Sequence, residues 1–249
     1  MKFLAIIPAR FASVRLPGKP LIKIGGVTMI ERVYKRVESR VERLFVATDH
    51  PEIIREVERF GGKVISTSSH HPNGTSRIFE ALTKIEAAEG VQYDYILNIQ
   101  GDQPFIEPSQ IEELKSCFEA GTTQIATLMK KIESQEELIN PSIPKVVVDS
   151  QNQALYFSRA PIPYIRDLPQ ERWLDHHHFY KHIGVYGFKR ETLMEIASLS
   201  EGELESVEKL EQLRWMEKGL KITLKESFYD TISIDTQKEL NSLKAKGLI

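Results

Sequence analysis

The chain has 249 residues, of which 41% are hydrophobic and 27% are charged, and its formal net charge is −2. A chain of this length can bury a large core in one big α/β domain or in a domain with an elaborated second lobe. The small net charge argues against broad adhesion to nucleic acid or to a membrane surface, so any basic site has to be local.

Two further features indicate the compartment. The single cysteine, Cys117, rules out an internal disulfide and suits a reducing environment, where the thiol would pack in the core. The first apolar run is too short for a signal peptide, and no segment approaches membrane-spanning length. We therefore expect a cytoplasmic protein.

The first predicted element is a strand at residues 3–7. Its unbroken apolar run is typical of a central parallel strand that helices cover on both faces. The loop after it carries Arg10, Arg15 and Lys19, and loops at the carboxyl ends of parallel strands bind ligands in open α/β sheets. We therefore predict a triphosphate site here, with a solvated connector as the alternative.

The same loop contains neither GxxxxGK[ST] nor GxGxxG, which disfavours both a P-loop nucleoside triphosphatase and a classical dinucleotide-binding fold. After it we predict helices at residues 28–40 and 52–60 and strands at residues 43–49 and 63–67. Strands that alternate with helix-length connections are typical of a parallel sheet with right-handed crossovers.

A polar loop, SSHHPNGTS at residues 68–76, leads into Arg77 and a predicted helix. Such a helix start offers free N–H groups, hydroxyls and a guanidinium to an anion or to a nucleobase edge. His70 and His71 are adjacent, so their side chains point apart on an extended segment, and no acidic or cysteine partner shares that segment. A zinc site is therefore disfavoured.

The next predicted strand, at residues 95–99, ends in Gln100, Gly101 and Asp102. We expect Asp102 at the same sheet edge as the cationic loop. A carboxylate beside phosphate-binding cations makes sense chiefly where it brings a hard divalent cation such as Mg²⁺. The alternative is that Asp102 forms a turn or caps the helix predicted at residues 107–120.

The pattern changes near residue 140. Residues 145–149 and 154–158 are typical of a hairpin, and a proline-rich segment follows Arg159. We interpret residues 140–190, approximately, as a lid or subdomain that carries the acceptor site and a subunit interface.

The remaining elements follow from the same periodicities. The predicted strands lie at residues 124–132, 179–188, 221–226 and 232–234, and the predicted helices at residues 205–218 and 236–244. The helix at residues 205–218 directs Val207 and Leu210 inward. Asp235 precedes the last helix and is interpreted as its N-cap.

Eight motifs in chain order carry a resemblance to a known family. They are IPARFASVRLPGKPL, VATDH, NGTSR, NIQGDQP, ALYFSRAPIP, HIGVYGF, LEQLR and ISIDT. Together they resemble the 3-deoxy-manno-octulosonate cytidylyltransferases, or CMP-Kdo synthetases, across essentially the whole chain. The motifs RLPGK and QGD alone would indicate only the wider superfamily of sugar nucleotidyltransferases. The motifs SRAPIP, HIGVYGF and LEQLR narrow the choice of acceptor sugar.

The resemblance implies one nucleotidyltransferase domain over residues 1–249 with a nucleotide-diphospho-sugar transferase (GT-A-like) fold. This fold is α/β, with a mostly parallel central sheet, helices on both faces and a smaller subdomain that contains the hairpin. The resemblance also implies a cytoplasmic homodimer that uses Mg²⁺ and binds neither nucleic acid nor membrane. Its reaction would transfer CMP from CTP to 3-deoxy-manno-octulosonate (Kdo), with release of pyrophosphate, before Kdo enters lipopolysaccharide.

The resemblance assigns individual residues as well. At the triphosphate it places Arg10, Arg15 and Lys19. At the cytidine it places Ser76, Arg77 and Gln100. It implies that Asp102 and Asp235 are the magnesium ligands. It also implies that these two residues and Lys19 are catalytic. At the sugar acid it places Arg159, His182, Tyr186, Glu211 and Gln212.

Two points stay open. The family commonly has QGDEP, whereas Gln103 stands here, so position 103 receives no metal role. No dedicated general base is evident. The alternatives are the same chemistry on 8-amino-Kdo or a sialic acid, an NAD-dependent oxidoreductase, or a nucleotide-binding regulator without catalytic activity.

Overall fold

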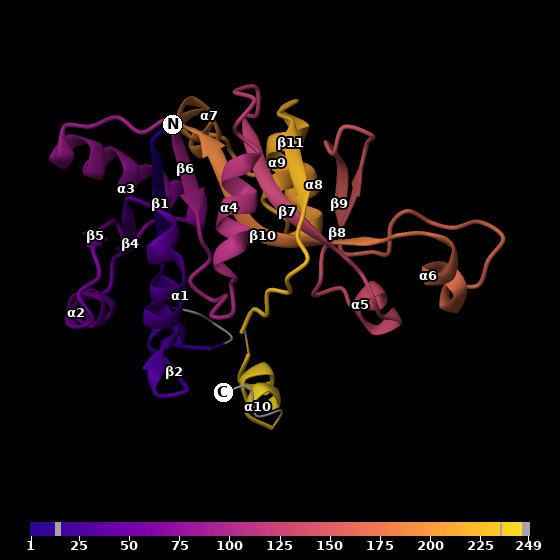
Figure 1. Cartoon of the computed structure of the whole chain (residues 1–249), viewed down its shortest axis with the longest axis horizontal. Coiled ribbons are helices and arrows are strands. Elements are labelled where there is room, and N and C mark those ends of the chain that lie inside the picture. The colour runs from indigo at the N-terminus through magenta and orange to yellow at the C-terminus, as the bar shows by residue number, and fades with distance from the viewer. Residues whose placement is uncertain (13–15, 235, 246–249) are drawn as a thin grey trace. The chain divides into compact units, whose positions relative to one another are not determined.

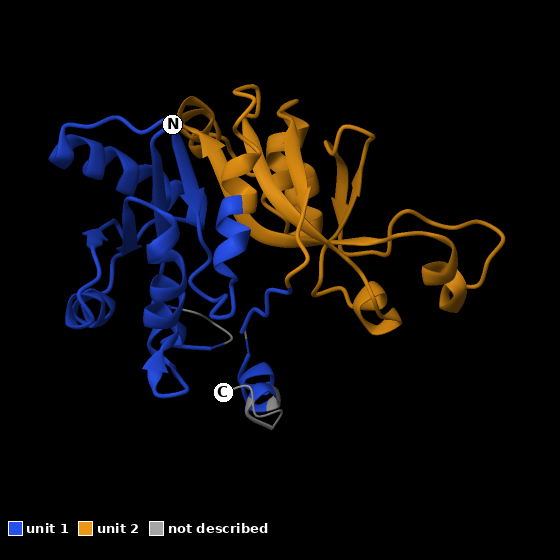
Figure 2. Ribbon diagram, viewed as in Figure 1, with its two compact units in different colours: residues 1–112, 230–249 blue, residues 113–229 orange. Residues whose placement is uncertain are grey.

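The structure is a computed structural model that describes residues 1–12, 16–234 and 236–245, without the side chains of residues 242, 244 and 245. The chain divides into two compact units (Figure 2). Unit 1 comprises Met1–Glu112 and Asp230–Ile249, and unit 2 comprises Glu113–Tyr229.

Unit 1 contains a parallel sheet in which β1 lies between β4 and β6, with β5 beyond β4 (Figure 1). Its strands are β1 (Phe3–Pro8), β4 (Leu44–Thr48), β5 (Val64–Ser66) and β6 (Tyr95–Asn98), and a separate pair is formed by β2 (Lys23–Ile24) and β3 (Val27–Thr28). Residues 4–7 of β1 are all 0% exposed. Because successive side chains of a strand point to opposite faces, both faces of β1 are covered, as predicted.

Side-chain caps mark where several helices of unit 1 begin. The helices are α1 (Met29–Val37), α2 (Pro51–Arg59), α3 (Gly74–Glu89) and α10 (Gln237–Ala245), with 3-10 turns at Lys19–Leu21 and Glu38–Arg40, while α4 (Pro108–Ser116) crosses the boundary between the units. Thr28 caps α1, and the Asn73 side chain accepts from Ser76 N at 2.9 Å to cap α3. Helix α3 therefore begins three residues before Arg77, so Ser76 and Arg77 lie in its first turn rather than in a loop.

Unit 2 combines parallel and antiparallel pairing. Its elements are α5 (Gln135–Ile139), α6 (Trp173–His176), α7 (Arg190–Ala197), α8 (Glu203–Glu208), α9 (Gln212–Glu217), a 3-10 turn at Gln170–Arg172, and strands β7 (Ile125–Lys131), β8 (Lys145–Val148), β9 (Ala154–Ser158), β10 (Tyr180–Lys189) and β11 (Ile222–Glu226). Strand β7 pairs with β11 in parallel and with β10 antiparallel. Strands β8 and β9 form the predicted antiparallel hairpin. The parallel pairs of β1 with β4 and β6, of β4 with β5 and of β7 with β11 confirm the predicted α/β class with a mostly parallel central sheet.

Two predictions of secondary structure were wrong. The helix predicted at residues 205–218 is two helices, because Lys209 has a φ of 52° and ends α8. A left-handed residue interrupts the helical hydrogen bonds and turns the chain, and Val207 is consequently 79% exposed rather than inward. Residues 232–234 form no strand, although Ile234 is buried and its N–H donates to the Asp102 carbonyl at 3.0 Å.

Several smaller expectations can also be compared with the structure. At the start of the last helix, α10, Thr236 Oγ1 accepts from Glu239 N at 3.2 Å and so acts as a cap. Asp235, the predicted cap, lies outside the described residues.

Cys117 is partly buried, and burial raises the pKa of its thiol to about 11. Among the described residues, no helix is both long and apolar enough to cross a membrane.

Candidate functional site

A pocket of about 550 Å³ lies in unit 1 where β1 and β6 end and α3 begins. Five of the residues predicted at the nucleotide or the metal line it: Arg10, Lys19, Arg77, Gln100 and Asp102. Chain segments that are far apart in the sequence meet here because the carboxyl ends of parallel strands share one sheet edge. The predicted juxtaposition of a cationic loop with Asp102 is therefore confirmed. Arg15 lies outside the described residues.

Lys19 and Asp102 form the most direct contact in the pocket. Lys19 Nζ donates to Asp102 Oδ2 at 2.6 Å. Gly18, with a φ of 67°, precedes Lys19 in a conformation that favours glycine. Gly101 is also required beside Asp102, because a Cβ there would lie 3.2 Å from the Pro8 carbonyl oxygen. The left-handed conformation of Gly18 and the close approach of Gly101 to Pro8 thus help to position the two residues of the ion pair.

Arg77 is held by two residues that the sequence analysis did not single out. Its guanidinium donates from Nη1 to Thr67 Oγ1 at 2.7 Å and pairs through Nη2 with Asp49 Oδ1 at 2.8 Å. Arg77 is only 4% exposed, and a charge this deep needs such a partner. The motif VATDH contains Asp49 and could have indicated it.

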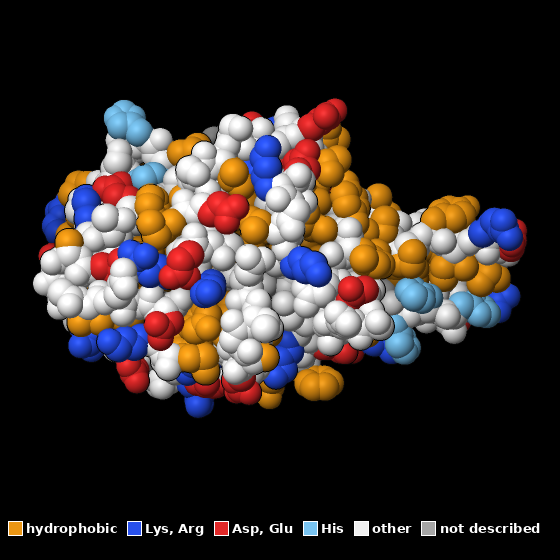
Figure 3. Space-filling model, turned by 90° about the horizontal axis from the view of Figure 1, so that it is seen from above, with side chains coloured by type: hydrophobic (Ala, Val, Ile, Leu, Met, Phe, Trp, Pro, Cys, Tyr) orange, Lys and Arg blue, Asp and Glu red, His pale blue; other side chains and the backbone are white. Residues whose placement is uncertain are grey.

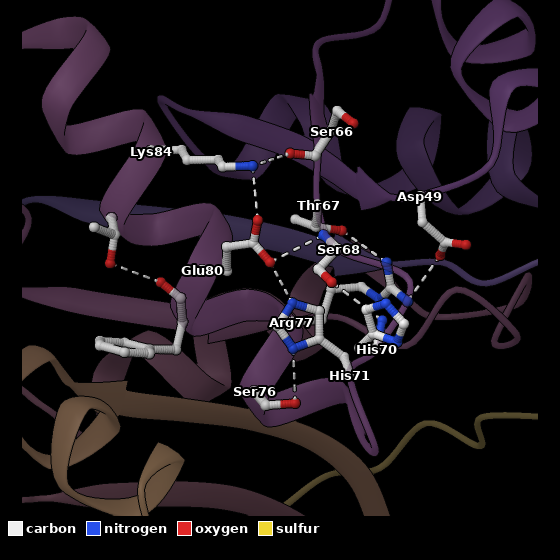
Figure 4. Close-up of polar contacts among 12 residues, drawn as sticks. Asp49, Ser66, Thr67, Ser68, His70, His71, Ser76, Arg77, Glu80 and Lys84 are labelled. Atoms are coloured by element: carbon white, nitrogen blue, oxygen red, sulfur yellow. Dashed lines mark hydrogen bonds and ion pairs between the residues drawn. The ribbon is translucent and has the colours of Figure 1, made fainter.

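The segment between β5 and α3 is organised around Glu80 (Figure 4). The Glu80 carboxylate accepts from Ser68 N at 3.0 Å, pairs with Lys84 Nζ at 2.7 Å and contacts His71 Nε2. Although burial opposes the charged form, the bonds from Lys84, Ser68 and His71 lower the pKa of Glu80 to about 2. Ser76, which was predicted at the cytidine, is not one of the residues that line the pocket, and its hydroxyl bonds to Asn73 O and to His71 Nδ1, both at 3.1 Å.

Asp102 is the one predicted magnesium ligand that the structure describes. No group of three or more His, Cys, Asp or Glu side chains is arranged for a metal ion within residues 1–12, 16–234 and 236–245. Mg²⁺ needs fewer protein ligands than that, since it is commonly held by one or two carboxylates together with substrate phosphates and water. A carboxylate that is 28% exposed in a cationic pocket suits such a site. The Ile234 N–H on the Asp102 carbonyl also brings the chain next to position 235 to this turn.

In unit 2, the structure brings His182, Tyr186 and Glu211 together. The ring centroids of His182 and Tyr186 lie 5.3 Å apart, and burial together with the Glu211 charge raises the pKa of Tyr186. Burial lowers the pKa of His182 to about 3, so this imidazole is neutral near pH 7. The Thr127 hydroxyl lies 3.0 Å from His182 Nε2 and donates its proton to a backbone carbonyl, so Nε2 is the nitrogen that carries hydrogen.

Two donors in the same part of unit 2 have no hydrogen-bond partner among the described residues. They are Tyr186 Oη and Gln212 Nε2, on side chains whose residues are 6% and 4% exposed. Buried polar groups are nearly always hydrogen-bonded in folded proteins. Both atoms are therefore available to donate to a polar ligand, and the sugar-binding roles that the resemblance implies for them stay a prediction.

Arg159 has a different environment from these residues. Its guanidinium donates to three backbone carbonyls, those of Glu208 at 2.6 Å, Pro141 at 2.9 Å and Lys209 at 3.2 Å. The Glu208 carboxylate accepts from Arg159 N at 2.9 Å. Glu208 was not singled out from the sequence, because a solvated helix face is the usual interpretation of a charged residue there.

The fold and the unit 1 pocket define a nucleotide-binding α/β transferase, and comparison with known proteins places it in a family. The model of the cytidylyltransferase family matches residues 4–222. A 3-deoxy-manno-octulosonate cytidylyltransferase of Bacteroides thetaiotaomicron is 50% identical over 96% of both chains. An 8-amino-3,8-dideoxy-manno-octulosonate cytidylyltransferase of Shewanella piezotolerans is 43% identical over 99% of this chain and 98% of its own.

The solved structures agree. A CMP:2-keto-3-deoxy-manno-octonic acid synthetase complexed with CTP matches with a TM-score of 0.88 and 39% identity, over 100% of this chain and 99% of its own. The chain belongs to the 3-deoxy-manno-octulosonate cytidylyltransferase family. This result confirms the resemblance, and it excludes the NAD-dependent oxidoreductase as an interpretation of the fold.

Proposed function

We propose that this protein transfers CMP from CTP to the C2 anomeric hydroxyl of Kdo and releases pyrophosphate. The observation that carries the proposal is the unit 1 pocket, which is lined by Arg10, Lys19 and Arg77 and by Asp102, the ion-pair partner of Lys19. Cations of this density suit a triphosphate, and a carboxylate among them suits the metal ion that accompanies it. The relatives' names supply the identity of the nucleotide and the acid.

Charge sets the requirements of the reaction. Kdo is a carboxylate and CTP carries several negative charges, so repulsion opposes the attack of the C2 hydroxyl on the α-phosphorus. In the proposal, Arg10, Arg15 and Lys19 bind the triphosphate and stabilise pyrophosphate as it leaves. Asp102 and Asp235 would hold Mg²⁺, which supplies further neutralisation of the phosphate charge when bound. Lys19, which pairs with Asp102 in the structure, would exchange this ion pair for the phosphates of CTP.

Residues at the base and at the sugar have separate tasks. We assign Ser76, Arg77 and Gln100 to the cytidine, and the fixed guanidinium of Arg77 supports this assignment. We assign the sugar acid to unit 2, through the set Arg159, His182, Tyr186, Glu211 and Gln212. Tyr186 Oη and Gln212 Nε2, which bond to none of the described residues, support this assignment, since both are positioned donors for hydroxyl or carboxylate oxygens. No general base is assigned.

We also propose that the protein is a cytoplasmic homodimer whose product is used in lipopolysaccharide synthesis. The region at residues 140–190 would supply the subunit interface and the lid. Its exposed apolar surface supports this, since Tyr164 is 76% exposed and a groove of about 490 Å³ runs beside α6. Figure 3 shows apolar and histidine side chains together over the α6 end of unit 2.

One assay tests the reaction and its nearest alternative. Pyrophosphate release is measured with CTP and Mg²⁺ in the presence of Kdo, 8-amino-Kdo or a sialic acid. We expect the highest kcat/KM with Kdo. The Shewanella relative makes 8-amino-Kdo the second candidate, and a higher kcat/KM with that sugar would replace Kdo in the proposal. CTP binding without pyrophosphate release from any of the three acids would favour the regulator.

A further inference from the structure

His71 occupies a position in unit 1 that the proposed reaction does not yet use. Its ring lines the nucleotide pocket, as do Asn73 and Gly74 at the start of α3. Both ring nitrogens have partners: Nε2 contacts the Glu80 carboxylate, and Nδ1 lies 3.1 Å from Ser76 Oγ (Figure 4). Glu80 is in turn fixed by Lys84 and by Ser68 N. His71 is thus clamped between two side chains of α3.

The number of hydrogens on the His71 ring determines which hydrogen bond the Ser76 hydroxyl can donate. Ser76 Oγ has one hydrogen and two acceptors within reach, Asn73 O at 3.1 Å and His71 Nδ1. If His71 is an imidazolium, both ring N–H groups donate, and Ser76 donates to Asn73 O. If His71 is neutral with its proton on Nε2, Nδ1 must accept, and Ser76 turns away from Asn73 O. The protonated ring therefore completes the bonding of the Asn73 turn, whereas the neutral ring competes with it.

The same proton changes the charge at the pocket. The Glu80 carboxylate remains ionised throughout the pH range at which a histidine can titrate, because its pKa is held at about 2. The other charged groups around the ring are Lys84 and Arg77 on α3, Asp49 after β4, and Arg10, Lys19 and Asp102 along the pocket. Arg77 is already paired with Asp49, and Lys19 with Asp102. A positive His71 adds a cation to a wall where Arg77 and Lys19 are partly neutralised.

We propose that His71 is a positioning residue for the nucleotide, which in its imidazolium form, held by Glu80 and Ser76, fixes the Asn73–Gly74 turn and attracts the triphosphate. The inference rests on the proposed function, since it takes CTP as the ligand of the pocket. It predicts that CTP affinity falls as pH rises and His71 loses its proton, because the positive charge and the bond from Ser76 Oγ to Asn73 O are then both lost. The Mg²⁺ site and the chemical step are not involved.

The test measures the Kd of CTP by calorimetry with Mg²⁺ and without sugar, from about pH 5 to about pH 8. His71→Gln removes the charge but keeps an amide that can donate to Glu80. We expect its Kd to exceed that of the wild type by about 10-fold at the low end of the series and by about 2-fold at the high end. The titration of CTP itself cancels in this ratio. His70→Gln, which removes the neighbouring exposed histidine, is the matched control and should leave the Kd unchanged.

Catalytic and stability readouts separate positioning from simple loss of structure. For His71→Gln we expect a raised KM for CTP, with kcat at saturating CTP within about 2-fold of wild type. In the wild type, the NMR signal of the His71 ring should titrate at higher pH when CTP is bound, and this measurement needs no variant. A ratio of Kd values that is equal at every pH, or a His71 signal that CTP does not shift, would overturn the inference.

Different results would refute the role of His71 and the proposed function. If the wild type binds CTP and the ratio of Kd values does not depend on pH, only the role of His71 is refuted. If the wild type binds no CTP at any pH, the proposed function is refuted first.

Discussion

The predicted binding residues differ in kind between the two units, since several in unit 1 are ion-paired and several in unit 2 are buried and neutral. In unit 1, the predicted residues already have ionic partners, as in the pairs Lys19–Asp102 and Arg77–Asp49. In unit 2, Tyr186 and Gln212 are buried neutral side chains with donors that have no partner among the described residues, and His182 is neutral. A multiply charged ligand can replace or join existing ion pairs, whereas a sugar needs available and correctly oriented hydrogen-bonding groups. The comparison therefore fits a nucleotide for unit 1 and a sugar for unit 2.

The largest expected effect concerns the carboxylate of unit 1. Asp102→Asn removes the charge that pairs with Lys19 and that would hold Mg²⁺, so we expect pyrophosphate release to fall by about 1,000-fold or more. Circular dichroism should show an intact fold. Asp94→Asn, at an exposed carboxylate that accepts from Lys2 N, is the control and should retain full activity. An Asp102→Asn variant with near-normal turnover would remove the ionic mechanism assigned to unit 1.

An intermediate effect is expected at the Tyr186 donor of unit 2. Tyr186→Phe deletes a buried hydroxyl that bonds to none of the described residues, so we expect the KM for Kdo to rise about 10-fold while the KM for CTP changes less than about 2-fold. The free energy of unfolding should be unchanged or higher, since no bond to a described residue is lost. Tyr180→Phe, on the same strand, is the matched control for the kinetics. A marked loss of stability in Tyr186→Phe would show that the hydroxyl has a structural partner.

The last effect concerns stability rather than activity, and it is a dependence on pH. The pKa of His182 is about 3 in the folded protein and about 6.5 in an unfolded chain, so the unfolded state binds more protons between these values. The contribution of His182 to stability is therefore complete above about pH 6.5 and declines as pH falls, by at most about 1.4 kcal/mol per pH unit.

Urea unfolding from about pH 6.5 to about pH 4.5 checks this dependence. The wild type should lose stability more steeply than His182→Gln, because glutamine has no proton to bind. Equal slopes for the two proteins would mean that His182 has the same pKa in the folded protein as in the unfolded chain. The buried pair of His182 and Tyr186 would then include a charged ring, and the contrast between the units would be weaker.

Much of the fold followed from local patterns. The apolar run at residues 3–7 predicted β1, and the strand and helix periods up to residue 99 predicted the parallel sheet of unit 1. Errors arose where one residue's backbone decided the outcome. At Lys209 a φ of 52° divides a continuous helical pattern, and a lysine gives no signal for a left-handed conformation.

What the sequence determined by itself was the set of chemical groups and the order in which they follow the strands: cations after β1, a carboxylate after β6, and the motifs of the family. Tertiary structure alone decided their partners. Asp49, Thr67 and Glu80 became part of the site only because folding brings the ends of β4, β5 and α3 together. Strand periodicity records which face a side chain occupies, but pairing between distant segments depends on the packed sheet, so the clamp on His71 could be recognised only in the folded chain.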